Sequence, residues 1–176
     1  EWLENGDHFD RVKLQKERDN IKNYVQHGAA LYKTLGPIVE YQKKVVIDFD
    51  DLEIPFVGYV DFVFENAIRD TKTTARKPSS LSEANSRQLS IYAMAYPDYQ
   101  VWVDYITPKE AVCYRLTNTE YYQKQVLKIA MGIRRFLSIS DDIHELLAMI
   151  HPDLDHWHWN DDMKTQANKI WGYTND

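Results

Sequence analysis

The sequence predicts an α/β or α+β fold in which helices flank a central mixed β-sheet. Two observations favour this class. Apolar residues recur at helical spacing in separate stretches, and short runs rich in β-branched and aromatic residues lie between and after them. The expected order is helix, three strands, helix, two strands and further helices, which suits one packed sheet with helices around it. With 176 residues, the chain is long enough to form a single domain, 1–176, around its own core.

The composition limits the class of protein. A net charge of −6 argues mildly against a sequence-independent DNA binder, although positive charge gathers around Arg69 and Lys72. Cys113 is the only cysteine, which excludes an internal disulfide and a four-cysteine iron–sulfur cluster within this sequence. The sequence contains neither an apolar run of membrane-spanning length nor a signal pattern. We therefore expect a soluble cytoplasmic protein, in the host cytoplasm if it is viral, with no membrane partner.

The N-terminal part is expected to form a helix followed by a strand. Residues 7–20 are heavily charged and predict a surface helix or an ordered arm. From residue 21 to Leu35 apolar side chains repeat at helical spacing, and Gly36-Pro37 is a typical helix stop. Residues 38–49 then predict the first strand, which an acidic turn connects to the second.

The second predicted strand carries a carboxylate in an apolar setting. Residues 54–64 are apolar almost without alternation, which predicts a strand covered on both faces. Asp61 interrupts this run. Burying even a neutral polar group without a partner costs about 2–7 kcal/mol, so we expect a cation or hydrogen-bond donors beside Asp61.

A third predicted strand brings a second carboxylate close to Asp61. Asp70 and Lys72 are two residues apart, so their side chains project from one face, and Asn66-Ala67 allows a tight hairpin that places Asp70 near Asp61. Two close carboxylates repel each other, and a divalent cation removes the repulsion. Mg²⁺ takes oxygen ligands of this kind, so the pattern predicts a magnesium site. Lys72 would face the substrate there and stabilise developing negative charge.

The rest of the chain predicts further helices and two strands. We expect a helix over residues 81–96, strands over 99–106 and 111–116, and C-terminal helices within 118–173. Four histidines lie at positions 144, 151, 156 and 158. Their spacing fits no standard zinc template, so we interpret them as packing residues.

Three motifs carry a family resemblance when they are taken in order. They are Gly58-x-x-Asp61, Asp70-x-Lys72 and Gln88-x-x-x-Tyr92. Together they resemble the motifs of the PD-(D/E)XK nuclease superfamily, and most closely those of its RecB-like exonuclease branch. The resemblance covers a core of about residues 20–117 and implies a restriction-endonuclease-like fold there.

The resemblance also implies roles for single residues. It implies that Asp61, Asp70 and the backbone carbonyl of Thr71 are metal ligands and that Lys72 is the catalytic lysine. Several nucleases of this branch carry an iron–sulfur cluster, and this chain, with one cysteine, does not match that subgroup.

Residues after the third strand are expected to border the active site. Gln88 and Tyr92 lie one helical turn apart and, by the resemblance, on the helix next to the site. Gln88 would hydrogen-bond a phosphate or a metal-bound water, and Tyr92 would stack on a base or orient the neighbouring strand. Arg76 and Lys77, in the polar connector over residues 73–80, would contact nucleic acid, and a solvated loop explains them equally well.

For two further residues, Glu40 and His27, a role as metal ligand stays open. A glutamate near the start of the first strand commonly accompanies the family's metal site, so Glu40 is either such a residue or, with Lys43, plain surface charge. The family often has a metal-binding histidine four residues after a glycine of the first helix. Counted from Gly28, that position is Tyr32. His27 is adjacent to the glycine instead, so a polar residue at the edge of the apolar stripe is the favoured interpretation.

The predicted function is Mg²⁺-dependent hydrolysis of DNA phosphodiester bonds, with Mn²⁺ expected to substitute. The resemblance implies an exonuclease of recombination or repair with a protein partner in that process. The segment Asp161-Asp162-Met163-Lys164 is also similar to bacteriophage exonucleases, which implies phage DNA processing. Two alternatives remain: an inactive nucleic-acid-binding module of the same fold, and a protein-interaction domain in which Arg or Lys neutralises Asp61.

Overall fold

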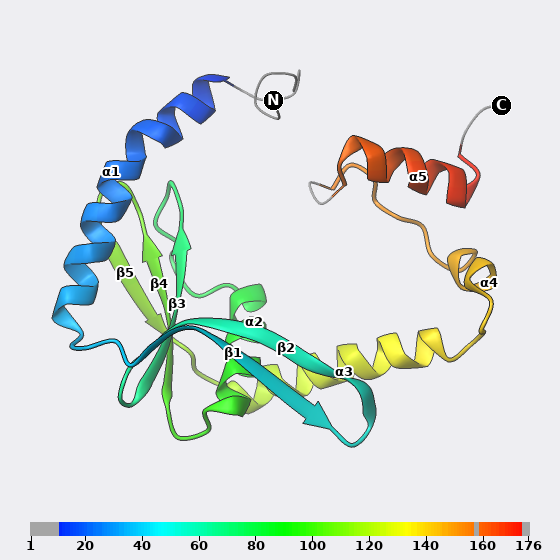
Figure 1. Ribbon diagram of the computed structural model, residues 1–176, viewed down its shortest axis with the longest axis horizontal. Coiled ribbons are helices and arrows are strands. Elements are labelled where there is room, and N and C mark those ends of the chain that lie inside the picture. The colour runs from blue at the N-terminus through cyan, green and yellow to red at the C-terminus, as the bar shows by residue number, and fades with distance from the viewer. Residues whose placement is uncertain (1–10, 157–158, 174–176) are drawn as a thin grey trace. The chain divides into compact units, whose positions relative to one another are not determined.

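The structure is a computed structural model, and it describes residues 11–156 and 159–173. Figure 1 shows its helices and strands. In chain order they are α1 (Arg11–Thr34), β1 (Glu40–Phe49), β2 (Leu52–Val63), β3 (Ala67–Thr73), α2 (Glu83–Ala95), β4 (Gln100–Ile106), β5 (Ala111–Arg115), α3 (Thr119–Leu137), α4 (Ile143–Leu147) and α5 (Asp161–Trp171).

The five strands form one open mixed sheet in the order β1-β2-β3-β4-β5. β3 and β4 are parallel, with α2 as the crossover between them, and the other neighbouring pairs are antiparallel. A parallel pair needs a crossover of this length, which explains why a helix separates these two strands. The predicted mixed sheet flanked by helices is confirmed.

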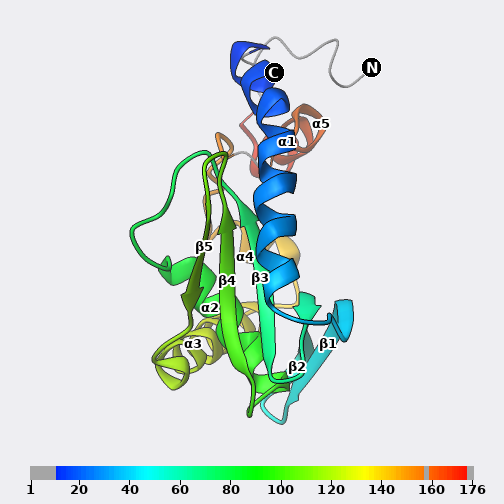
Figure 2. The same cartoon turned by 90° about the vertical axis from the view of Figure 1, so that its left-hand side faces the viewer.

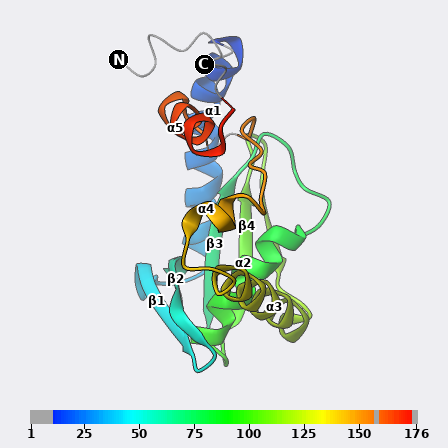
Figure 3. The same cartoon turned by 90° about the vertical axis from the view of Figure 1, so that its right-hand side faces the viewer.

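Helices cover both faces of the sheet. α1 lies on one face, and α2 with the beginning of α3 lies on the other, as Figures 2 and 3 show from opposite sides. On the α1 side, Gly28 lies against Ile106 of β4. On the α2 side, Leu89 and Tyr92 pack with Val103 in the core. The sheet is therefore the middle of three layers, and the charged groups Arg69, Asp70 and Asp104 of β3 and β4 are buried within it.

The helix ends follow local chemistry. The charged stretch at the start belongs to α1 from Arg11 on, and Gly36, with φ of 87°, follows the helix. Ser82 caps α2 by accepting a hydrogen bond from the Asn85 N–H. Gly172, with φ of 71°, ends α5. In the described ranges, no helix is long and apolar enough to cross a membrane.

Packing divides the chain into two compact units, Glu1–Lys128 and Ile129–Asp176. The first contains the sheet, α1, α2 and the first half of α3. The second contains the rest of α3, α4 and α5. Of the four C-terminal histidines, His158 lies outside the described residues, and His151 contacts the Tyr173 hydroxyl at 2.6 Å through its Nδ1.

The expectation that the second strand is covered on both faces was wrong. Ile54, Val57 and Tyr59 of β2 are 75%, 54% and 53% exposed. The cause is the register, because β2 pairs with β3 only at Phe62 and Val63, whereas its pairing with β1 extends from Leu52 to Val63. Most of β2 therefore belongs to a two-stranded hairpin with one strand neighbour.

Candidate functional site

The site lies where β2 and β3 separate. A tight turn joins the two strands, and in it the Phe64 N–H donates to the Ala67 carbonyl at 2.8 Å, as the predicted hairpin requires. Pairing continues to Phe62 opposite Arg69 and then stops. Asp61 and Asp70 are the next residues on the two strands. The hairpin thus brings the two predicted carboxylates to the point where the ladder opens.

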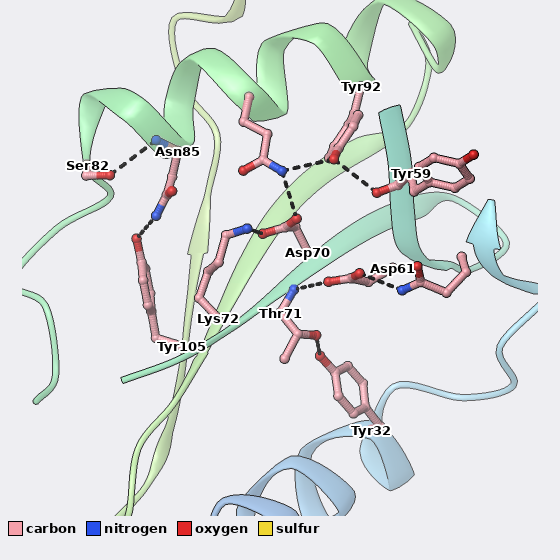
Figure 4. A network of polar contacts seen from close by, with 12 residues as sticks. Tyr32, Tyr59, Asp61, Asp70, Thr71, Lys72, Ser82, Asn85, Tyr92 and Tyr105 are labelled. Atoms are coloured by element: carbon pink, nitrogen blue, oxygen red, sulfur yellow. Dashed lines mark hydrogen bonds and ion pairs between the residues drawn. The ribbon is translucent and has the colours of Figure 1, made fainter. Parts of the chain in front are cut away.

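Neutral donors hold the carboxylate of Asp61. Its Oδ2 accepts a hydrogen bond from the Thr71 backbone N–H at 2.7 Å, as Figure 4 shows. Its Oδ1 accepts one from Gln42 Nε2 at 2.8 Å. Gln42 lies in β1 and has a φ of 48°, which is unusual for a residue other than glycine within a strand. Asp61 therefore links three strands at the site.

Asp70 is buried beside one cation. Its side chain is 4% exposed, and Lys72 Nζ lies 2.9 Å from Oδ2 as an ion pair, which confirms that the two side chains share a face. Among the described residues no donor meets this oxygen with hydrogen-bond geometry. Burial raises the pKa of Asp70, the ion pair with Lys72 lowers it, and the charge of Asp61 raises it, with a net upward shift. The site thus contains a carboxylate that is incompletely stabilised.

Gln88 and Tyr92 connect α2 to the site. Gln88 Nε2 lies 3.4 Å from Asp70 Oδ1 and 2.9 Å from the Tyr92 hydroxyl, which in turn donates to the Tyr59 carbonyl at 3.0 Å. Tyr92 is 5% exposed and part of the core, so the expectation of base stacking was wrong. The bond from the Tyr92 hydroxyl to the β2 backbone fixes the distance between α2 and β2. Tyr92 therefore orients the neighbouring strand, which is the other role predicted for it.

The α1 side of β3 carries a second set of contacts that the sequence interpretation missed. The Thr71 side chain bonds to the Tyr32 hydroxyl, and Tyr32 also donates to Asp104 at 3.1 Å. Arg69 binds both oxygens of Asp104, at 2.7 and 2.6 Å. Asp104 is a lone carboxylate in an apolar strand, the same signal that singled out Asp61. Arg69, grouped by sequence with surface cations, is 6% exposed.

The remaining predicted residues lie apart from the carboxylate pair or on the surface. Glu40 forms an ion pair with Lys43 at 2.6 Å, with both side chains more than 40% exposed. His27 is half-buried on α1, and Arg76 is exposed. Lys77 Nζ lies 3.3 Å from Glu110, and both of these side chains are half exposed. The structure therefore brings together the predicted site residues of β2, β3 and α2, and it places Glu40 in a surface ion pair.

The donors at the site fit a hard divalent cation. Asp61 and Asp70 offer carboxylate oxygens and Thr71 a carbonyl, and Mg²⁺ typically takes one or two carboxylates with waters. The strongest indication is the buried Asp70 Oδ2, whose neighbour is the Lys72 ammonium at 2.9 Å and which has no hydrogen-bond partner among the described residues. The part of the chain that the structure describes gathers no cluster of three or more His, Cys, Asp or Glu side chains. Two carboxylates would therefore carry the ion.

Comparison with known proteins adds little. No protein-family model matches the chain, and no curated protein matches it. Among solved structures, the chain is similar to one titled "Crystal structure of SSO0001", with 14% sequence identity and a TM-score of 0.42. The match covers 65% of this chain and 59% of that chain, so it spans less than two thirds of that protein. The function therefore rests on the site itself.

Proposed function

We propose that the protein is a Mg²⁺-dependent nuclease that hydrolyses DNA phosphodiester bonds. One observation carries the proposal: Asp61 and Asp70 lie at the opening between β2 and β3, with the Lys72 ammonium 2.9 Å from Asp70. Two carboxylates can bind a metal ion while the cationic side chain beside them binds a phosphate. The motif resemblance described above supports the same function and suggests an exonuclease of recombination, repair or phage DNA processing.

Each residue has a separate task in this proposal. Asp61, Asp70 and the Thr71 carbonyl would hold the ion, which, when bound, offsets the phosphate charge and makes its water more acidic. Lys72 pairs with Asp70 and its side chain is 33% exposed, so its ammonium can bind a phosphate oxygen as negative charge develops. Gln88 keeps Asp70 oriented through its amide.

The test is a cleavage assay with matched variants. Linear and circular DNA, single- and double-stranded, and an RNA oligonucleotide are incubated with Mg²⁺, Mn²⁺ or EDTA. The wild type is expected to cut DNA only with a divalent ion, and Asp70→Asn is expected to be inactive because it removes ligand charge at constant shape. Lys72→Ala should bind Mn²⁺ normally in calorimetry yet lose about 10²-fold or more in rate. Lys109→Ala, an exposed lysine of the β4–β5 turn, is the control.

One alternative has an observation in its favour. Lys72 already supplies a cation to Asp70, and Gln42 and Thr71 already supply donors to Asp61. Because both carboxylates already have partners within the chain, the site also suits an inactive nucleic-acid-binding module. DNA binding by the wild type without cleavage in any divalent ion would select this alternative and reject the nuclease. Near-wild-type cleavage by Asp70→Asn would reject the assigned ligands.

A further inference from the structure

A buried polar network lies on the α1 side of β3, opposite the candidate metal ligands. Side chains alternate along a strand, so Asp70 and Lys72 face α2 while Arg69 and Thr71 face α1. In the parallel pairing, Thr71 lies beside Asp104 of β4. One strand thus carries the candidate ligands on one side and anchors itself to α1 and β4 on the other.

The hydrogen bonds of this network have one consistent direction. The Tyr32 hydroxyl has a single proton, and it is donated to Asp104, because a carboxylate only accepts. The Thr71 hydroxyl therefore donates to Tyr32. Burial, together with the charge of Asp104, raises the pKa of Tyr32, so the phenol stays protonated as a donor. Arg69 completes the chain with two bonds to Asp104.

Stability alone does not explain a buried network of this kind. Arg69 and Asp104 have 7% and 0% of their side chains exposed, and a buried ion pair commonly gives no more stability than apolar side chains of similar volume. The Arg69 guanidinium also lies over the Trp102 ring, 5.1 Å from its centroid, so its plane is fixed. What a fully bonded buried network provides is a single defined geometry.

We propose that Tyr32 and Asp104 are positioning residues, which hold Thr71 and thereby fix the geometry of the Asp61–Asp70 pair. Thr71 is held at its hydroxyl by Tyr32 and at its N–H by Asp61. The strand next to Asp70 therefore cannot rotate without breaking one of these bonds. The consequence for metal binding rests on the proposed nuclease function, whereas the ordering of Thr71 does not.

The test removes single hydroxyls of the network. Tyr32→Phe and Thr71→Val are each expected to lower the affinity for Mn²⁺, measured by calorimetry on the full chain, by about 10- to 100-fold, the usual cost of losing a group that orients a metal ligand. Hydrogen exchange of the Thr71 amide, followed by NMR without metal, should become faster. Thr71→Ser keeps the hydroxyl and should remain close to the wild type.

The control is on the same helix. Tyr24 donates its hydroxyl to Glu17 of the same helix at 2.8 Å and is not part of the network, so Tyr24→Phe should change neither quantity. The double variant Tyr32→Phe/Thr71→Val should lose no more affinity than the single variant with the larger loss, because the bond between the two hydroxyls is already absent in either single variant.

The outcomes separate this inference from the nuclease proposal. Unchanged Thr71 exchange and unchanged Mn²⁺ affinity in Tyr32→Phe would overturn the positioning role, and so would losses in the two single variants that simply add. If Tyr32→Phe does not fold, Thr71→Val against Thr71→Ser decides the same question. A wild type that binds no Mn²⁺ rejects the metal site, and the exchange of the Thr71 amide then decides the structural part alone.

Discussion

At the scale of single residues, the protonation state of Asp70 depends directly on its surroundings. Its carboxylate is buried next to a second carboxylate, and one lysine only partly compensates. The folded protein therefore holds the proton of Asp70 more tightly than the unfolded chain does, with an ordinary pKa of 3.8 as the reference. Protons and a metal ion compete for the same oxygens, so metal affinity is expected to rise as the pH rises through the pKa of Asp70.

The same shift predicts a pH-dependent stability. Because the pKa of Asp70 is higher in the folded state, its contribution to the free energy of unfolding is fully present below pH 3.8 and is lost as the pH rises through the folded pKa. Asp70→Asn cannot ionise and avoids this loss. In metal-free protein, the Tm of Asp70→Asn minus that of the wild type is therefore expected to grow from about pH 4 to pH 7.

Calorimetry over that pH range checks the prediction. Glu110→Gln, which removes a half-exposed carboxylate paired with Lys77, is the control and should show little change. A Tm difference for Asp70→Asn that is constant or falls with pH would show that the carboxylate is well compensated in the folded protein.

At the scale of elements, the approach of α2 to β2 depends on the absence of one side chain. A Cβ at Gly58 would lie 2.8 Å from Cε1 of Tyr92 and 3.6 Å from Val45. The Tyr92 ring cannot easily yield, because its hydroxyl is held by Gln88 and by the Tyr59 carbonyl. The glycine of the first motif therefore has a packing role, separate from the chemistry of Asp61.

We expect Gly58→Ala to destabilise the protein by about 1–3 kcal/mol, the usual cost of overpacking a core. The matched control is Gly132→Ala in α3, where an added Cβ meets nothing within 4 Å. Alanine is better than glycine within a helix by about 1 kcal/mol, so this control should be neutral or stabilising. Urea midpoints of the two variants provide the measurement, and an unchanged midpoint for Gly58→Ala would show that α2 moves freely away from β2.

The helices, the strands and the approach of Asp61 to Asp70 could be predicted from the sequence, because each depends on residues close together in the chain. Helical periodicity and strand runs gave the element order, and one short turn determines that Asp61 and Asp70 meet. The pairing of Arg69 with Asp104 was not accessible, because the two residues are 35 positions apart and meet only through the parallel register that α2 makes possible. The exposure of Tyr59 was missed for the same reason, since an apolar run does not show how many strands lie beside it.

At the scale of the whole molecule, the two units differ in how much they bury. Among the described residues of Ile129–Asp176, only Leu146 and Ala167 are buried apolar side chains. Several large apolar residues there, including Ile133 and Met163, are 56% and 44% exposed. Opening of this unit therefore exposes little additional apolar surface, and its free energy of local opening is expected to be low.

Hydrogen–deuterium exchange of the full chain, read by mass spectrometry, tests this contrast. Peptides from α5 are expected to exchange much faster than peptides from β4, whose Val103 is fully buried. The difference arises because backbone bonds break more readily where few buried contacts hold them. Equal protection of α5 and β4 would contradict the prediction and would mean that the helix is stabilised by contacts beyond its own unit.

The left-handed backbone of Gln42 has a consequence for association between chains. β1 is one of the two edge strands of an open sheet, and such edges can add a strand from another molecule and begin aggregation. In β1, Tyr41 and Lys43 pair with β2 and Gln42 between them does not. Two charged residues, Lys43 and Lys44, follow directly. Natural sheets use local irregularity and lysine to protect their edges. Gln42, which donates a hydrogen bond to Asp61, thus also interrupts the regular backbone of the edge with which a strand of another molecule would pair.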